Sequence, residues 1–278
     1  MNAVATAGIA LVAGGDPVTA ARLGLSMLCM QLSIGAVNDV ADVELDQVAK
    51  PGKPIPAGLL SMRVARGWAV VTAGLALALA APSGIGAIAV ATAAMGLGYL
   101  YDLRLSRTAL SWLPLSLALP LVPIFGWLGV AGGVPATLLA IVPAAVLAGA
   151  ALILGNGLVD LERDKLAGKG TLPVRLGRNS AWATHAVLFG AAVAVAFVSA
   201  PGPAALDATD GPPGILGIIR MLGLPLGALL VAAGTALVAA AGPGTRERGW
   251  ELEGVGTLVL GVCWLAGVAV ASGWGAVG

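Results

Sequence analysis

The sequence predicts an all-α membrane protein, a bundle of about nine transmembrane helices built from two related halves, with an apolar chamber that faces the lipid. Three observations predict this class. The chain of 278 residues is 58% hydrophobic and only 10% charged, and its mean hydropathy is +0.95. Apolar runs of about 20 residues, the length that crosses a hydrocarbon core, recur along the whole chain. The 41 glycines suit close packing of helices in lipid.

The chain contains nine apolar segments, and glycine- and proline-rich breaks at 14–17, 82–84, 132–135 and 201–203 separate some of them. The first segment is too short to span a membrane at a rise of about 1.5 Å per residue, so either it tilts into the interface or the chain starts upstream. We expect one membrane domain, 1–278, with repeat halves of roughly 1–118 and 119–278. The segments are 3–14, 17–38, 62–81, 84–101, 108–130, 136–158, 180–199, 214–241 and 254–276.

The basic residues predict which loops face the cytoplasm. If the segments alternate in direction, the loops after the even-numbered segments and their flanks hold 13 of the 15 Lys and Arg residues. The other face keeps only Arg22 and Arg220. Because Lys and Arg are enriched in cytoplasmic loops, we expect an integral protein of the cell membrane with this basic face in the cytoplasm. No basic cluster is long enough to indicate a nucleic-acid partner.

Two passages at the cytoplasmic ends of the second and sixth segments share the pattern N-x-x-x-D-x-E-x-D. Matching residues are 118 positions apart, which indicates an internal repeat. Helical residues four apart drift by only about 40°, so the asparagine and both aspartates of each passage lie on one stripe. The passages hold Asn38, Asp42, Glu44 and Asp46, and Asn156, Asp160, Glu162 and Asp164.

Carboxylate and amide oxygens are hard ligands that suit Mg²⁺ better than zinc. Mg²⁺ prefers one or two carboxylates plus phosphate oxygens, so two facing stripes should hold metal ions that bridge to a phosphorylated ligand. The ligand should also carry an apolar part, because the site opens into apolar helices. The candidate metal ligands are Asn38, Asp42, Asp46, Asn156, Asp160 and Asp164.

Basic residues in the adjoining loops would reverse the negative charge of the two stripes and allow a diphosphate to approach. They follow the first stripe, the fourth segment and the second stripe. Together with the first asparagine, the candidate diphosphate-binding residues are Asn38, Lys50, Lys53, Arg104, Arg107, Lys165 and Lys169. We expect five other cations, Arg63, Arg66, Arg178, Arg246 and Arg248, to be interfacial. His185 stands alone in an apolar run, and we expect a packed or lipid-edge side chain.

Three passages resemble the UbiA superfamily of intramembrane prenyltransferases, and the resemblance extends from Gln31 to the last segment. NDVADVELD resembles the first aspartate signature of the family, and KPGKPIPAG is similar to the proline-rich stretch behind it. DLERDKLAGKGTLPVRLG looks like the second aspartate motif and its ending. The resemblance implies two Mg²⁺ ions that bind an isoprenyl diphosphate and assist its ionisation to an allylic cation. A membrane-soluble acceptor, often a phenol or quinol ring, is then alkylated.

Carried over by position, Asn38, Asp42 and Asp46 would hold one ion, and Asp160 and Asp164 the other. One passage, YDLRLSR at 101–107, departs from the family. It has Ser106 where a lysine is common, and Asp102 and Arg104 replace smaller residues. Either Arg104 or Arg107 restores the lost charge, or the passage marks a subgroup with another acceptor. Tyr101 either steadies the cation through its ring face or is an interfacial tyrosine.

The residues leave other functions open. The same site would serve a cyclase, in which the ionised chain closes on itself without an acceptor. A glycerol-phosphate lipid or a haem would replace the aromatic ring without changing the first step. A transporter built on a repeat is the alternative outside enzymes, but its polar residues belong at the membrane midplane, whereas these acids lie at the membrane face.

Overall fold

The computed structural model describes residues 1–200 and 215–271, and every regular element within these ranges is a helix. Eight helical stretches among the described residues, some of them formed by two successive helices, are long and apolar enough to cross a membrane, which confirms the predicted class. The first helix has 11 residues and is too short to cross, as expected. The break predicted at 201–203, residue 214 and residues 272–276 lie outside the described residues.

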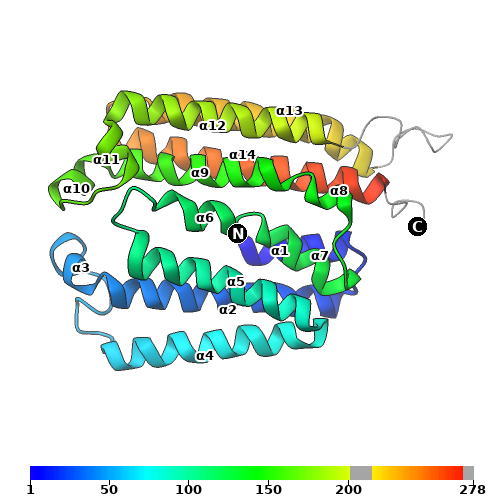
Figure 1. Cartoon of the computed structure of the whole chain (residues 1–278), viewed down its shortest axis with the longest axis horizontal. Helices are drawn as coiled ribbons and strands as arrows, with labels where there is room; N and C mark the ends of the chain where they lie inside the picture. The colour runs from blue at the N-terminus through cyan, green and yellow to red at the C-terminus, as the bar shows by residue number, and fades with distance from the viewer. Residues whose placement is uncertain (201–214, 272–278) are drawn as a thin grey trace.

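The helices between residues 2 and 131 lie together in the lower part of Figure 1. α2 packs against α1 and α4, and α5 packs against α6 and α7. Hydroxyl groups fasten α2 to α4, since Ser26 Oγ donates to Ala76 O and Ser33 Oγ donates to Ala69 O, each at 2.7 Å. The helices are α1 Asn2–Val12, α2 Pro17–Ala41, α3 Val43–Ala49, α4 Met62–Ala80, α5 Ile85–Leu100, α6 Trp112–Ala118 and α7 Leu121–Ala131.

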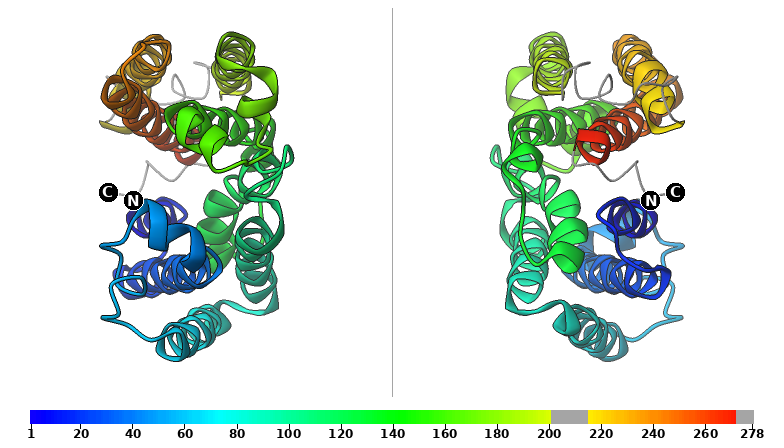
Figure 2. Two further views of the ribbon diagram at one scale, coloured as in Figure 1. Left: turned by 90° about the vertical axis from the view of Figure 1, so that its left-hand side faces the viewer. Right: turned by 90° about the vertical axis from the view of Figure 1, so that its right-hand side faces the viewer.

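The helices from residue 136 onwards lie in the upper part of Figure 1, where α13 packs on α14 and α12 packs on α9. Figure 2, which looks along the helices, shows the two groups joined on one side of the molecule. The joining contacts come from α6 with α9 and from α1 with α14. The helices are α8 Ala136–Leu139, α9 Val142–Val159, α10 Leu161–Leu166, α11 Leu172–Leu176, α12 Arg178–Ser199, α13 Ile215–Val238 and α14 Pro243–Ala271.

Three predicted segments differ from the structure. The segment 136–158 is two helices, α8 and α9, and the other two differ for local reasons. The segment 108–130 is two helices, α6 and α7, which separate at Leu119 and Pro120. Proline lacks the N–H that would continue the helix. The last segment begins at Pro243 rather than at residue 254. Because of the charged residues between 246 and 253, the predicted apolar segment begins too late in the chain. In the structure, Arg246 and Glu253 are 2% and 0% exposed. Both side chains bond to other helices, which allows the helix to contain them.

Small residues allow α5 to approach α2 closely near the end that carries the first motif. A Cβ atom added to Gly98 would lie 2.7 Å from Ile34 Cδ1, closer than real carbon contacts. Both positions are one helical turn before residues of the first site, because Ile34 precedes Asn38 and Gly98 precedes Asp102. The close approach therefore sets the distance between α2 and the end of α5.

Candidate functional site

Both aspartate motifs lie at the same end of the bundle, where α3, α10 and α11 gather at the left of Figure 1. Each long helix ends at its first aspartate, and a short helix follows it. Asp42 has φ −98° and ψ 8°, and Asp160 has nearly the same angles, φ −92° and ψ 8°. The predicted stripes are interrupted at these residues. The spacing of four residues persists, because Asp46 N and Asp164 N donate to the carbonyl oxygens of Asp42 and Asp160 at 2.8 Å.

The second aspartate of each motif is buried and paired with a lysine. Asp46 and Asp164 are each 5% exposed. Lys53 Nζ lies 2.6 Å from Asp46 Oδ2 and 2.8 Å from Asp39 Oδ1, and Lys169 Nζ lies 2.8 Å from Asp164 Oδ1. Burial alone would lower the pKa of Lys53, but its bonds to both carboxylates outweigh burial and raise that pKa. Lys53 therefore carries its positive charge at neutral pH.

Arg107 connects the two motifs. Its Nη2 donates to Asp42 Oδ1 at 3.1 Å, and its backbone oxygen accepts from Gly170 N at 2.9 Å. Gly170 follows the second motif, and its own oxygen accepts from Arg175 Nε at 3.0 Å. The loop after α5 is thus bonded to the first motif through a side chain and to the second through its backbone.

The passage that departs from the family forms one turn of π-helix, Tyr101–Leu105, at the end of α5. Such turns are frequent at functional sites. The Tyr101 side chain is near enough to feel the charges of Asp42, Asp160 and Asp164. Asp102 is buried and accepts a hydrogen bond from Asn38 Nδ2 at its Oδ1, at 3.0 Å. Both residues face the motifs.

Other predicted residues stay outside this cluster of bonds. Lys50, Arg104 and Lys165 are exposed and take part in no salt bridge within the described residues. Asn156 is half-buried, and its backbone oxygen accepts from Asp160 N at 3.1 Å. Asp160 pairs with its neighbour Arg163 at 2.8 Å. Of the two arginines left open above, the structure therefore brings Arg107 rather than Arg104 to an aspartate.

Glu162 and two arginines expected at the interface form a structural cluster. Glu162 Oε2 accepts from Arg246 Nη2 at 2.6 Å, and Glu162 Oε1 pairs with Arg178. Arg246 is 2% exposed, so the expectation that it is interfacial is wrong. Because its neighbours in α14 are also charged, the sequence does not indicate that the Arg246 side chain points into the bundle. Arg178 and Arg246 instead fasten α10 to α12 and α14.

A buried acid–base pair lies farther from the motifs. His185 is packed and fully buried, with Nε2 2.7 Å from Glu253 Oε1 and Nδ1 2.9 Å from Ala151 O. Thr235 Oγ1 donates to the same glutamate oxygen at 3.0 Å. Sequence reasoning missed Glu253, because nothing in its spacing from the histidine indicates a contact. It also missed Asp39 as the second partner of Lys53.

The donor set fits Mg²⁺ but does not form a cage. Within the described residues, no group of three His, Cys, Asp or Glu side chains lies close enough to hold a metal ion alone. Mg²⁺ takes one or two carboxylates and completes its shell with water and phosphate oxygens. Each motif offers two aspartates and a nearby asparagine. These residues would hold an ion that also binds a diphosphate.

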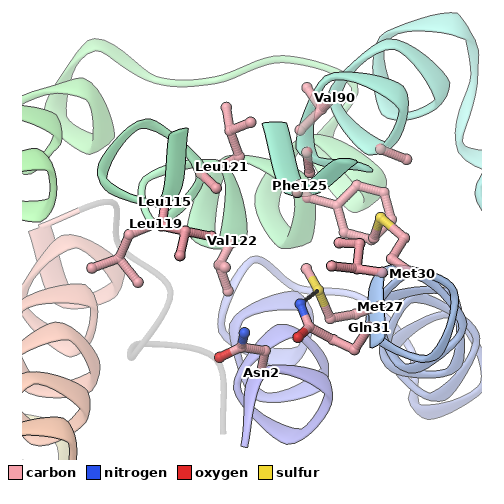
Figure 3. A pocket seen from close by; sticks show the side chains of 15 residues that line it. Asn2, Met27, Met30, Gln31, Val90, Leu115, Leu119, Leu121, Val122 and Phe125 are labelled. Carbon is pink, nitrogen blue, oxygen red and sulfur yellow. Dashed lines mark hydrogen bonds between the residues drawn. The ribbon is translucent and has the colours of Figure 1, made fainter. Parts of the chain in front are cut away.

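An apolar cavity of about 170 Å³ lies between α1, α2, α5, α6 and α7. Figure 3 shows Met27, Met30, Val122 and Phe125 pointing into it. Ile34 of α2 also lines it, one turn from Asn38. The cavity therefore begins about one helical turn below the polar residues of the first motif. The site can accept a charged head at the membrane face with an apolar chain beneath it.

The chain matches known prenyltransferases. The model of the UbiA prenyltransferase family matches residues 1–248. Digeranylgeranylglyceryl phosphate synthase of Hyperthermus butylicus is 29% identical over 198 residues, 66% of this chain and 65% of that protein. The aligned part is thus less than two thirds of the length of that relative.

Two solved structures share the fold. A UbiA homolog from Aeropyrum pernix K1 has a TM-score of 0.72 and 20% identity, over 98% of this chain and 97% of that one. A UbiA homolog from Archaeoglobus fulgidus bound to GPP and Mg²⁺ has a TM-score of 0.68 and 19% identity, over 98% and 96%. The family match covers most of the sequence, and the chain belongs to the UbiA prenyltransferase family.

Proposed function

We propose that the protein transfers an isoprenyl group from a prenyl diphosphate to a glycerol-phosphate lipid. The observation that carries the transfer is the meeting of the two aspartate motifs around Arg107, directly above an apolar cavity. The relatives support the acceptor. Digeranylgeranylglyceryl phosphate synthases of Hyperthermus butylicus, Pyrococcus abyssi and Methanopyrus kandleri match this chain. They favour this acceptor over the aromatic ring expected from the sequence.

The aspartates and the basic residues of the site would have different roles. Asp42, Asp46, Asp160 and Asp164 would hold two Mg²⁺ ions, with Asn38 and Asn156 as amide ligands. When bound, the ions would offset the negative charge of the diphosphate and so favour cleavage of its bond to the allylic carbon. Lys53, Lys169 and Arg107 now pair with the aspartates. They are placed to turn towards phosphate oxygens and stabilise the leaving group.

The apolar cavity would hold the prenyl chain and exclude water, which would otherwise capture the cation. A hydroxyl group of the acceptor lipid would attack the allylic carbon and lose its proton as the diphosphate departs. Tyr101 lies close to both motifs, and its ring face would stabilise the positive charge of the allylic group. We also propose that this end of the bundle faces the cytoplasm, on the charge asymmetry of the loops.

A choice of acceptors tests the proposal. The purified protein in liposomes receives geranylgeranyl diphosphate and Mg²⁺, with either geranylgeranylglyceryl phosphate or 4-hydroxybenzoate, and mass spectrometry identifies the products. We expect a doubly prenylated glyceryl phosphate. An alkylated benzoate as the only product would overturn the acceptor, and a cyclic hydrocarbon would make the protein a cyclase. Absence of any product would overturn prenyl transfer.

A further inference from the structure

Asp102 lies beside the first motif and has no part in the proposed function so far. We propose that Asp102 is a positioning residue that orients the Asn38 side chain, so that its amide oxygen is free to bind the metal ion. The inference rests on the proposed function, in which Asn38 is a metal ligand. It assigns a role to one of the three residues at which this chain departs from the family pattern.

The hydrogen bonds of Asn38 define the orientation of its amide. Asn38 Nδ2 lies 3.0 Å from Asp102 Oδ1 and 3.5 Å from Asp42 Oδ2. Carboxylate oxygens only accept, so both neighbours require the NH₂ group of Asn38 on their side. Turning the amide over would place its oxygen against two carboxylates. The shorter of the two bonds goes to Asp102, which therefore contributes more to holding the amide.

The end of α5 brings Asp102 to this position. Ser106 N donates to Tyr101 O at 2.8 Å, a hydrogen bond across five residues that widens the last turn. One turn earlier, Gly98 lets α5 lie against Ile34 of α2, where a Cβ atom would clash at 2.7 Å. A wide turn on a closely packed helix thus places the Asp102 carboxylate against α2.

The buried charge of Asp102 has fewer stabilising partners than a residue with a purely structural role would need. Its side chain is 7% exposed, and Oδ2 is buried without a hydrogen-bond partner in the described part of the chain. Its charged neighbours Asp42 and Asp39 are acids. A buried carboxylate in this state destabilises a fold, and ionisable residues inside membrane spans are commonly functional. Replacing Asp102 by an apolar residue should therefore preserve stability while weakening the metal site.

The test compares two variants that separate hydrogen bonding from charge. Asp102→Leu removes the acceptor, whereas Asp102→Asn keeps an oxygen that can accept from Asn38 but removes the charge. Mn²⁺ binding is followed by electron paramagnetic resonance on the purified protein with geranyl S-thiolodiphosphate, a donor that ionises poorly. We expect Asp102→Leu to lower Mn²⁺ affinity by about 10-fold or more, as for other residues that orient metal ligands. Asp102→Asn should stay within about threefold of wild type, and so should the exposed control Glu44→Gln.

Two further measurements make the result decisive. The thermal unfolding temperature of Asp102→Leu should equal or exceed that of wild type, since a poorly compensated buried carboxylate is removed. When Asn38→Ala is already present, adding Asp102→Leu should lower Mn²⁺ affinity by less than about a further threefold, because the two residues act as one unit.

Equal losses in Asp102→Leu and Asp102→Asn would show that charge matters, and would overturn the positioning role. Undiminished binding by Asp102→Leu would overturn it too, and would leave the proposed function standing. A wild-type protein that binds no Mn²⁺ with the diphosphate would overturn the proposed function and this inference together.

Discussion

At each motif the two aspartates have different surroundings. Asp46 and Asp164 are buried beside lysines, whereas Asp42 and Asp160 are more exposed and pair with arginines. Exposed ion pairs contribute little to stability, and a buried charge that loses its partner is costly. Asp164 is the only carboxylate bonded to Lys169 in the described residues, while Lys53 also bonds Asp39. Asp164→Asn should therefore destabilise the fold more than Asp46→Asn.

Single Asp→Asn changes at these four positions are predicted to lower turnover by about 10² or more, roughly 3 kcal/mol of transition-state stabilisation. Each removes one hard ligand and nearly keeps its shape. The matched control is Glu44→Gln, since Glu44 lies in the same motif but is exposed, and its loss should stay below about tenfold. Turnover is measured as diphosphate release at saturating donor. If Glu44→Gln lowered turnover as much as the aspartate variants do, the assignment of the aspartates as ligands would be refuted.

Among the elements, the loop after α5 offers a test of which arginine matters. Arg107→Ala removes the charge that bonds Asp42, and we expect kcat/KM for the donor to fall by about tenfold, the range of one hydrogen bond to a charged group. Arg104→Ala is the control, because Arg104 is exposed in the same loop, and it should change kcat/KM by less than about threefold. Equal losses of kcat/KM in both variants would mean that the total positive charge of the loop matters, and would contradict a specific role for Arg107.

Helix α9, which carries the second motif, is held by side chains from α12 and α14. His185 bonds Ala151 O and Glu253, and Trp250 Nε1 donates to Leu152 O at 2.9 Å. His185→Leu leaves Glu253 without its histidine in the bundle, and should lower the free energy of unfolding by about 3–5 kcal/mol. The double variant His185→Leu/Glu253→Leu should recover part of this loss. Chemical unfolding in detergent measures both, and strict additivity would contradict a coupled pair.

At the scale of the whole molecule, the charge asymmetry predicts that both motifs face the cytoplasm. Cysteines placed at Gln47 and Ala167, in a protein with Cys29 and Cys263 replaced by alanine, test the topology. Both positions are exposed next to the motifs. A membrane-impermeant maleimide should label them in inverted vesicles and leave them unlabelled in intact cells. Labelling of both cysteines in intact cells would show that the motifs face the outside, which would contradict the predicted orientation.

Much of this architecture follows from patterns of residues that are near one another in sequence. Apolar length predicts the spans, and the repeated spacing around Asp42 and Asp160 predicts two equivalent acidic motifs at one end, although it gives no sign that each helix is interrupted at the first aspartate. Contacts between distant segments escape such reasoning. Glu44 and Glu162 look equivalent in sequence, yet only Glu162 binds Arg246 across the bundle. The bond between Asn38 and Asp102 likewise depends on how α5 packs on α2, which no local pattern encodes.

The central claim is that the two motifs act together on one diphosphate. Mg²⁺-dependent diphosphate release by Asp42→Asn, Asp160→Asn and the double variant tests it most directly. If both aspartates act on the same leaving group, each single change should cost about 10², and the double variant should be little worse than either one. Losses that multiply to about 10⁴ in the double variant, or a single variant that keeps full activity, would contradict the claim.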